Sequence, residues 1–463
     1  MENIIIGAGP AGRLAALELG ILGEEVLLIE KRHIAGTCLN EGCMVICALA
    51  DIARFLSNKK HFESLGLMKG NIEISYNEIT SKVKKTQEIL RKINQEENES
   101  VNNKVIYGEA IVDDSNVYVN GESYDFKNLL IATGSRPFIP NIEGVEYAIT
   151  SSDILGIDKV PEKLNIVGGG MIAAEVSNIF TSFGSEVNII TCDSFLEELD
   201  PEIRNYTISH LYKDVNIYEN TNVLKIKKNG LITNNNEFEG QTFLATGRIP
   251  NSEIVKDIVS INKDFSIKVS GMMQTSNPNI YAAGDVTGGL NLTPVARMEG
   301  ITAARNMAGY PTKAEYKHIP QSLTLDMDVS FTSNTYKELA THDNVADDNQ
   351  NSSPNNEKIA EDNNQKSIQK NSNNETETIS FPGIAGPGSF WNVLSQNTGL
   401  SKVSVNMKTK KIDSINAISP SSVSDVAYLS FLMRINEDLD KFDEFIEIHP
   451  STDAFIKIMK YII

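Results

Sequence analysis

The segment that decides the fold is Asn3-Ile4-Ile5-Ile6-Gly7-Ala8-Gly9-Pro10-Ala11-Gly12. A short apolar run, typical of a buried strand, ends here in a glycine-rich turn. A helical pattern follows over residues 13–20, and a second apolar run from Val26 to Ile29 ends at Glu30. Strand, glycine turn, helix, strand and acid in this order predict an α/β unit that binds a dinucleotide.

Each glycine of this turn has its own expected role. Gly7 allows the tight turn, Gly9 lets the backbone approach a pyrophosphate, and Gly12 lets the helix pack close to the strand. The pyrophosphate would lie at the N-terminus of the helix. Glu30, eighteen residues after Gly12, can accept hydrogen bonds from a ribose.

The same arrangement occurs a second time in the chain. The apolar run Leu164-Asn165-Ile166-Val167 leads into Gly168-Gly169-Gly170-Met171-Ile172-Ala173, and the next predicted strand ends at Thr191. Ala173 and Thr191 are again eighteen residues apart, so Gly168, Gly170, Ala173 and Thr191 are candidate binding residues. Two such units predict two nucleotide cofactors.

Three of the four cysteines lie close together, at Cys38, Cys43 and Cys47. In a regular helix, Cys38 and Cys43 would lie about 7.5 Å apart along the axis, beyond the limit of about 7 Å for a disulfide. Pairing would therefore need a distorted backbone, which Gly42 and Asn40 tolerate. Inert buried thiols are the alternative, but clustering beside a nucleotide-binding pattern favours a chemical role.

The run Gly36-Thr37-Cys38-Leu39-Asn40-Glu41-Gly42-Cys43 resembles the active-site run of the flavoprotein disulfide reductases, in particular the dihydrolipoamide dehydrogenases. The resemblance implies a redox-active pair in which Cys43 is the flavin-side thiol and Cys38 attacks the substrate disulfide. It also implies that Gly36 and Thr37 help to bind FAD. The expected activity is electron transfer between NAD or NADP and a small or protein-bound disulfide, with FAD as the resident cofactor.

The resemblance also implies a domain order. We expect an α/β protein with two Rossmann-like domains, FAD-binding at residues 1–145 and NAD(P)-binding at 146–268. A return segment of the FAD domain would follow at 269–314, and an α+β interface domain at 315–463 would form a homodimer. A non-enzymatic flavin-binding redox sensor or partner protein of the same fold is the alternative.

Two further motifs match the family. Ala132-Thr133-Gly134 and Ala245-Thr246-Gly247 resemble the exits from the two nucleotide domains, which places Ala132, Thr133, Gly134 and Gly247 among the expected cofactor contacts. Residues 275–285 resemble the second flavin motif, in which the aspartate accepts hydrogen bonds from the ribityl chain. That role is carried to Asp285, and the following helix, at 295–308, would lie near the flavin.

The sequence departs from the family at Cys47. The family has a lysine four residues after the second cysteine, and it pairs near the flavin with a glutamate that corresponds to Glu175. Glu175 is therefore expected to lack its partner here. Cys47 is either a small apolar filler or a third redox thiol, since it would share a helix face with Cys43.

A second departure concerns the nicotinamide coenzyme. An acid for the ribose of NADH would be expected at Thr191, which is neutral, whereas NADPH would call for an arginine near this point. Asp193 could bind the ribose of NADH instead. The preference between NAD and NADP stays open.

The C-terminal part matches the family less closely. The run Glu447-Ile448-His449-Pro450-Ser451-Thr452-Asp453-Ala454 resembles a motif whose histidine, supplied by the other subunit, is the acid/base beside the disulfide. His449 takes that role. The carboxylate that orients it falls on Ala454 without a gap, or on Asp453 if the turn is one residue tighter.

Local patterns predict the remaining elements. Helices are expected at 44–68, 77–98 and 424–436, and strands at 319–331, 400–406 and 411–418. The segment at about 338–378 is rich in Asn, Ser, Asp and Glu, so we expect a disordered or long-loop insertion.

The composition limits the partners. With 42 basic and 61 acidic side chains the net charge is −19, which argues against nucleic acid or an anionic membrane as a partner. No apolar run approaches the roughly 18 residues that span a bilayer, and the N-terminus shows no secretion signal. We expect a cytoplasmic protein without a metal site, whose one disulfide is catalytic.

Overall fold

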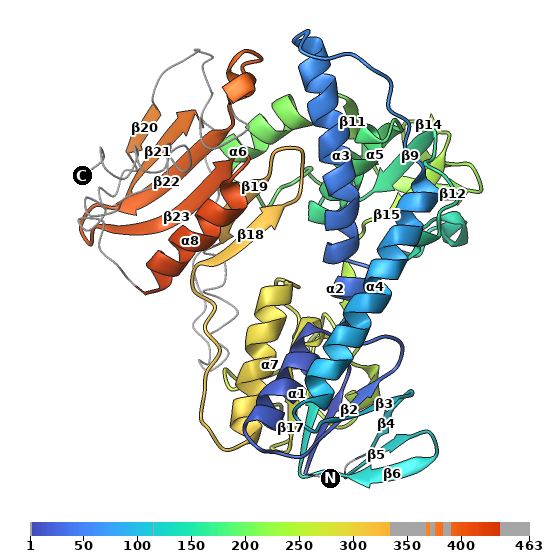
Figure 1. Cartoon of the computed structure of the whole chain (residues 1–463), viewed down its shortest axis with the longest axis vertical. Coiled ribbons are helices and arrows are strands. Elements are labelled where there is room, and N and C mark those ends of the chain that lie inside the picture. Colours follow the sequence, from blue (N-terminus) through green and yellow to red (C-terminus); the bar gives the residue numbers. More distant parts are fainter. Residues whose placement is uncertain (1, 114, 334–366, 371–375, 383–389, 436–463) are drawn as a thin grey trace. The chain divides into compact units, whose positions relative to one another are not determined.

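The computed structural model describes residues 2–113, 115–333, 367–370, 376–382 and 390–435. Contacts between Cα atoms divide the chain into two compact units. The first consists of Met1–Glu197 and Asp214–Glu315, and the second of Glu198–Lys213 and Tyr316–Ile463 (Figure 1).

The first unit contains a five-stranded parallel sheet in the order β17-β7-β1-β2-β3. Its strands are β1 (Asn3–Ile6), β2 (Val26–Glu30), β3 (Lys104–Tyr107), β7 (Asn128–Ile131) and β17 (Ile280–Ala282). The first apolar run is therefore a central strand, as predicted. Both its faces are covered, since all four residues of β1 are buried.

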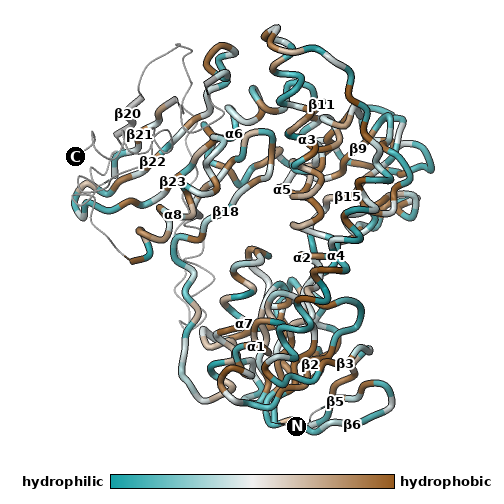
Figure 2. Tube along the Cα trace, viewed as in Figure 1, coloured by the Kyte–Doolittle hydropathy of each residue, from teal (hydrophilic) through white to brown (hydrophobic). Residues whose placement is uncertain are grey.

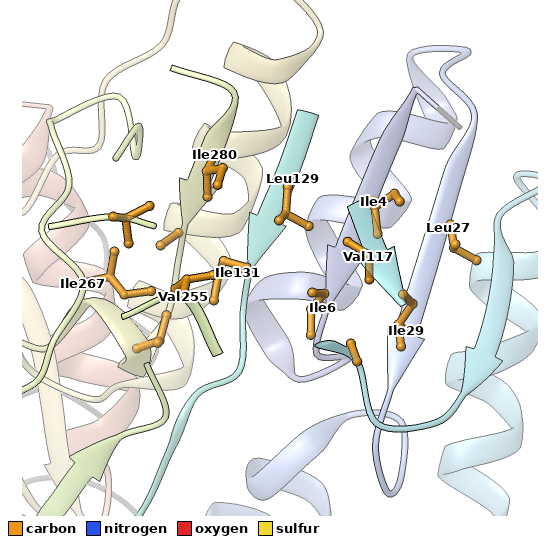
Figure 3. Packing of buried hydrophobic residues seen from close by; sticks show 14 of the residues in the cluster. Ile4, Ile6, Leu27, Ile29, Val117, Leu129, Ile131, Val255, Ile267 and Ile280 are labelled. Atoms are coloured by element: carbon orange, nitrogen blue, oxygen red, sulfur yellow. The ribbon is translucent and has the colours of Figure 1, made fainter. Parts of the chain in front are cut away.

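The buried strands of this sheet share one apolar core (Figure 3). Ile4 and Ile6 of β1 lie beside Leu27 and Ile29 of β2, and Leu129 of β7 contributes from the other side. In Figure 2 the hydrophobic residues of this part of the chain gather on its strands. The core holds the carboxyl ends of β1 and β2 in register, and those ends carry the glycine turn and Glu30.

Four helices of the first unit surround the predicted site. They are α1 (Pro10–Ile21), α3 (Cys43–Ser64), α4 (Tyr76–Glu99) and α7 (Thr293–Met307). Helices α1 and α7 touch at their backbones, because a Cβ atom added to Gly300 would lie 2.2 Å from the carbonyl oxygen of Ala11. The helices predicted at 44–68, 77–98 and 295–308 are confirmed with small shifts at their ends.

A second parallel sheet, in the order β11-β10-β9-β15, forms the other half of the first unit. It consists of β9 (Lys163–Val167), β10 (Glu186–Ile190), β11 (Val215–Tyr218) and β15 (Gln241–Leu244), with α5 (Met171–Ser182) following β9. Helix α3 packs against this half through Val45, Leu49 and Ala53. The cysteine helix thus links the two nucleotide-binding halves.

Small antiparallel sheets complete the first unit. They are formed by β4 (Ile111–Val112), β5 (Asn116–Val119) and β6 (Glu122–Asp125), by β12 (Val223–Lys227), β13 (Gly230–Thr233) and β14 (Glu237–Phe238), and by the pair β8 (Ser135–Pro137) and β16 (Arg248–Pro250). Strands β8 and β16 follow the two Ala-Thr-Gly segments and hydrogen-bond to each other. The strands that follow the Ala-Thr-Gly segments of the two halves therefore pair with each other.

The second unit contains a six-stranded antiparallel sheet in the order β18-β19-β23-β22-β21-β20. Its strands are β18 (Ile319–Leu323), β19 (Val329–Ser333), β20 (Ser367–Lys370), β21 (Thr376–Pro382), β22 (Leu400–Asn406) and β23 (Lys411–Ile418). Helix α8 (Ser422–Arg434) packs on the sheet through Val426, Leu429 and Met433. The expected strands at 400–406 and 411–418 and the helix after them are confirmed.

A short segment, Glu198–Lys213, belongs to this second unit. It carries α6 (Pro201–Tyr206) and a π-helical turn at Thr207–Leu211. Lys402 of β22 binds the segment, with its Nζ 2.9 Å from an oxygen of Asp200 and 3.3 Å from one of Glu202. The Lys402 side chain is 13% exposed, so these contacts lie out of bulk water and anchor the segment to the sheet.

One strand prediction for this unit is wrong. Residues 319–331 form no single strand, because the chain turns between β18 and β19, where Leu325 N donates to Asp328 Oδ1 at 3.2 Å. Most of the insertion predicted at about 338–378 lies outside the described residues. Its described residues, 367–370 and 376–378, belong to β20 and to the start of β21. Seven residues of β21 pair with β22, so hydrogen bonding to a neighbouring strand decides this conformation despite the polar sequence.

Candidate functional site

The first glycine turn leads into the N-terminus of α1 without a side-chain cap. Gly7 has φ +101°, and a Cβ atom there would lie 2.3 Å from the carbonyl oxygen of Ala132. Gly9 is the N-cap of α1, and no side chain caps the helix and no acidic residue lies in its first turn. Backbone N–H groups at this end are therefore available to an anion.

Glu30 lies beside this turn at the end of β2 and is buried. Ala8 N donates to Glu30 Oε2 at 2.8 Å, and Arg32 N donates to Oε1 at 2.7 Å. The two bonds hold the carboxylate at the strand end, and each oxygen keeps a lone pair for a ribose hydroxyl. Turn, helix end and acid together fit the adenosine and pyrophosphate part of FAD.

Asp285 ends a chain of hydrogen bonds that starts in the other half of the unit. Arg248 Nε donates to Ser135 Oγ, and Ser135 Oγ donates to Asp285 Oδ2, both at 2.7 Å. Burial lowers the pKa of Arg248, and the negative charge of Asp285 opposes this shift. Glu299 of α7 accepts a bond from Gly284 N at 2.7 Å and so supports the turn before Asp285.

The other expected cofactor residues lie around the same junction. Thr133 Oγ1 donates to the carbonyl oxygen of Asn251 at 2.7 Å, so its hydroxyl joins the two halves. Gly134 and Gly247 have φ values of +67° and +98°, and no atom lies within 4 Å of a Cβ added to either. These two turns are open on the side where a side chain would stand.

The second glycine turn repeats the first. Gly168 has φ +122°, Gly170 caps α5 without a side-chain hydrogen bond, and Ala173 is fully buried. Thr191 is buried directly after β10. A Cβ atom added at Gly169 would lie 2.7 Å from Thr191 Oγ1, so this hydroxyl group packs against the glycine turn. Thr191 Oγ1 also accepts a bond from Asp193 N at 3.3 Å, so this hydroxyl is already engaged.

The predicted break between the two cysteines is confirmed. Cys38 lies in the short helix α2 (Gly36–Asn40), and Cys43 begins α3. Gly42 between them has φ −126° and ψ −127°, far from helical values. The buried side chain of Gln87, from α4, donates to the carbonyl oxygens of Leu39 and Asn40 at 2.9 and 3.1 Å and satisfies the end of α2.

Cys38 and Cys43 are both free cysteines, and each acts on the pKa of the other. Cys43, together with Thr293 and Arg297, lowers the pKa of Cys38 to about 6, against the effect of burial. Cys38 and burial raise the pKa of Cys43. Cys38 therefore loses its proton more readily than Cys43.

Comparisons with known proteins agree with this geometry. Residues 1–300 match the family model described as pyridine nucleotide-disulphide oxidoreductase. The dihydrolipoyl dehydrogenase of Geobacillus stearothermophilus is 32% identical over 348 residues, covering 69% of this chain and 72% of that protein. A dihydrolipoyl dehydrogenase of Bacillus subtilis is 31% identical over 356 residues, with the same two shares.

The chain belongs to the pyridine nucleotide-disulphide oxidoreductase family. It is a flavoprotein disulfide reductase that uses FAD and NAD(P), and the alternative of a non-enzymatic flavin protein is not favoured. An uncharacterised protein of Methanocaldococcus jannaschii is 28% identical over 99% of this chain and 97% of its own length. The fold matches the HOCl-induced flavoprotein disulfide reductase RclA of Escherichia coli with a TM-score of 0.80, 22% identity and full coverage of both chains.

Cys47 of the reductase is exposed on α3, one helical turn after Cys43. Although its side chain reaches solvent, partial desolvation by the surrounding protein raises its pKa most, and Cys43, Glu175 and Asp51 raise it further. Arg54, farther along α3, opposes this shift. The lysine of the family is replaced by Cys47, as the sequence shows, but Glu175 does interact with other groups.

Several residues around the thiols were not predicted. Thr293 and Arg297 of α7 lower the pKa of Cys38, and Arg248 of β16 is close enough to interact with Cys43. They lie more than 200 positions from the cysteines, so no local pattern could indicate the contact. For Arg248, its position directly after the second Ala-Thr-Gly segment could have indicated that it lies near the cofactor site.

The expected acid/base, His449, lies outside the described residues, as do Asp453 and Ala454. Among the residues that the structure describes, no cluster of three or more His, Cys, Asp or Glu side chains could hold a metal ion. None of the helices in this part of the chain is long and apolar enough to cross a membrane.

Proposed function

We propose that this reductase transfers two electrons from NADH to a disulfide substrate through Cys38 and Cys43. The observation that carries the proposal is the pair of free cysteines at the junction of α2 and α3, in which the pKa of Cys38 is lowered to about 6. Bound FAD supplies the hydride chemistry that links the nicotinamide to the pair. Gly7, Gly9, Gly12, Glu30 and Asp285 would hold it.

The thiol pair would act in two exchange steps. The Cys38 thiolate attacks one substrate sulfur, forms a mixed disulfide, and expels the other substrate sulfur as a thiolate. Cys43 then loses its proton and attacks Cys38 Sγ, which closes the Cys38–Cys43 disulfide and expels the second substrate thiolate. The substrate gains two electrons that the pair loses, and His449 would give the protons to the leaving thiolates.

The substrate is a small or protein-bound disulfide. The test is steady-state oxidation of NADH by the FAD-loaded protein with lipoamide, glutathione disulfide, cystine and oxidised thioredoxin. We expect turnover with at least one of them. Oxidation of NADH by oxygen alone, with none of the disulfides consumed, would contradict the proposal.

The charges around the second glycine turn favour NADH over NADPH. The hydroxyl of Thr191 is engaged, and the exposed acid next to it is Asp193. Glu219, at the end of β11, accepts a bond from Phe195 N at 2.7 Å. Neither 191–197 nor 214–222 contains a lysine or arginine, so a 2′-phosphate would meet only negative charge.

Asp193→Asn should lower kcat/KM for NADH by about three- to ten-fold, because a ribose hydroxyl would lose a charged acceptor worth about 1 kcal/mol. Asp193→Arg should reverse the preference towards NADPH. The kcat/KM values for both coenzymes decide this point. As a control, Glu197→Asn changes another exposed acid of the same segment and should leave the ratio alone. An unchanged NADH/NADPH ratio in both Asp193 variants would mean that Asp193 does not face the ribose.

We further propose that the reductase is a homodimer in which His449 serves the partner's thiols. Helix α8 has apolar residues on two faces. Val426, Leu429 and Met433 are buried against the sheet, whereas Tyr428, Phe431 and Ile435 are exposed at helical spacing. A second copy of the chain would cover this outer face and remove its apolar surface from water.

Phe431→Glu should convert the dimer to a monomer, because it places a charge in the apolar stripe of α8. Disulfide turnover should fall at least ~10-fold with it, since His449 would no longer reach a partner's thiols. Light scattering after gel filtration measures the mass. Phe265→Glu is the matched control, because Phe265 in the first unit is equally exposed at 58%. If the Phe431→Glu protein is still a dimer, the outer face of α8 is not the dimer interface.

A further inference from the structure

We propose that Thr293 and Arg297 of α7 are positioning residues that hold the negative charge of the reduced Cys38–Cys43 pair. This inference rests on the proposed role of the two cysteines. It adds a second support for the thiolate besides the effect of Cys43 on the pKa of Cys38. The support comes from a helix that the chain reaches about 250 residues later.

The geometry of α7 carries the inference. Thr293 is the first residue of α7, and its Oγ1 lies 3.7 Å from Cys43 Sγ, within hydrogen-bonding distance for sulfur. The same hydroxyl lowers the pKa of Cys38. A single hydroxyl group can therefore donate to whichever sulfur carries the charge while the proton moves between them.

Arg297 follows Thr293 by one helical turn, so the two side chains share a face of α7. Its positive charge lowers the pKa of Cys38. The first turn of α7 contains no acidic residue, so the positive end of the helix dipole faces the thiols without compensation. The hydroxyl of Thr293, the N-terminus of α7 and the guanidinium of Arg297 thus all favour the thiolate form of Cys38.

Other charged groups near the pair do not replace this support. On α3, Cys47 acts against the Cys38 thiolate. Arg248 of β16 interacts with Cys43, but its Nε and Nη2 bind Ser135 and its charge is shared with Asp285. Of the residues acting directly on Cys38, Arg297 is the one that carries a full positive charge.

The experiment measures alkylation of Cys38 in the reduced, FAD-loaded protein. Peptide-resolved mass spectrometry would follow the iodoacetamide reaction of Cys38 between pH 4.5 and 9. Thr293→Val removes the hydroxyl and keeps the shape. It should move the midpoint upward by about one pH unit, which lowers the rate at pH 6 about five-fold. Thr293→Ser should restore the original profile.

Arg297→Gln should give a smaller shift, about two-fold in rate, because Arg297 is exposed and solvent screens its charge. In 1 M salt the difference between Arg297→Gln and the unmodified protein should vanish, whereas the effect of Thr293→Val should persist. Arg297→Lys should behave like the unmodified protein. Arg305→Gln, which removes an arginine of α7 that pairs with Glu18, should leave the profile unchanged.

Cys43→Ser separates this inference from the proposed function. If Cys43→Ser raises the midpoint but Thr293→Val and Arg297→Gln do not, the role of α7 is refuted and the thiol pair stands. If Cys43→Ser also leaves the midpoint unmoved, the paired thiols themselves are refuted. Flavin content and circular dichroism confirm that each variant is folded.

Discussion

Cys38→Ser is expected to abolish disulfide reduction, by at least ~1,000-fold, because the attacking sulfur is removed. NADH should still bleach the absorbance of the bound flavin, since Cys38 is not needed for that transfer. Cys43→Ser should also stop turnover, but at a later point. Its Cys38 can still attack the substrate, and the mixed disulfide should accumulate because no second thiol resolves it.

Mass spectrometry distinguishes these two results. Cys43→Ser protein should gain the mass of one substrate half at Cys38 when it is mixed with the disulfide, whereas Cys38→Ser protein should gain none. Cys192→Ser is the control, because Cys192 is exposed and has no role in either exchange step. Turnover that survives in both active-site variants would refute the dithiol mechanism. A mixed disulfide on Cys43 would exchange the roles of the two sulfurs.

Gly12→Ala is expected to remove FAD and to destabilise the first unit. A Cβ atom at residue 12 would lie 1.9 Å from the carbonyl oxygen of Gly7, which is backbone and cannot rotate away. Helix α1 would have to move off β1, and this displacement should cost about 1–3 kcal/mol or more. The same movement would shift the helix N-terminus away from the pyrophosphate position.

The ratio of flavin to protein absorbance and the midpoint of thermal unfolding measure the two effects. Gly156→Ala is the matched control, because no atom lies within 4 Å of a Cβ added at Gly156, and its φ is not positive. It should retain FAD and full stability. If Gly12→Ala also retains FAD with an unchanged midpoint, the turn at residues 7–12 does not hold the cofactor.

Local patterns predicted the parts of the fold that depend on local geometry. The two strand–glycine–helix units follow from glycines at fixed spacing and from apolar runs, because backbone sterics and burial act over a few residues. The break at Gly42 followed from the rise of a helix between two cysteines. The sequence of the hairpin at 319–333 did not reveal its turn, because polar and apolar residues continue through it.

Strand β21 shows where local reasoning stopped. Its sequence is too polar to indicate a strand, yet it pairs with β22 over seven residues. The neighbouring strand supplies the hydrogen bonds, and Ile379 is buried in the sheet. Such pairing depends on a strand elsewhere in the sequence, and the intrinsic strand propensity of the residues in β21 does not predict it.

By itself, the sequence determined the fold class, the two nucleotide-binding units, the redox pair and the family resemblance, because each depends on residues within a few positions of one another. Only the tertiary structure decided how the thiols are charged. The hydroxyl of Thr293 and the guanidinium of Arg297, both on α7, lower the pKa of Cys38. Electrostatic and hydrogen-bond energies depend on distance in space, and Thr293 comes 250 positions after Cys43 but lies 3.7 Å from it.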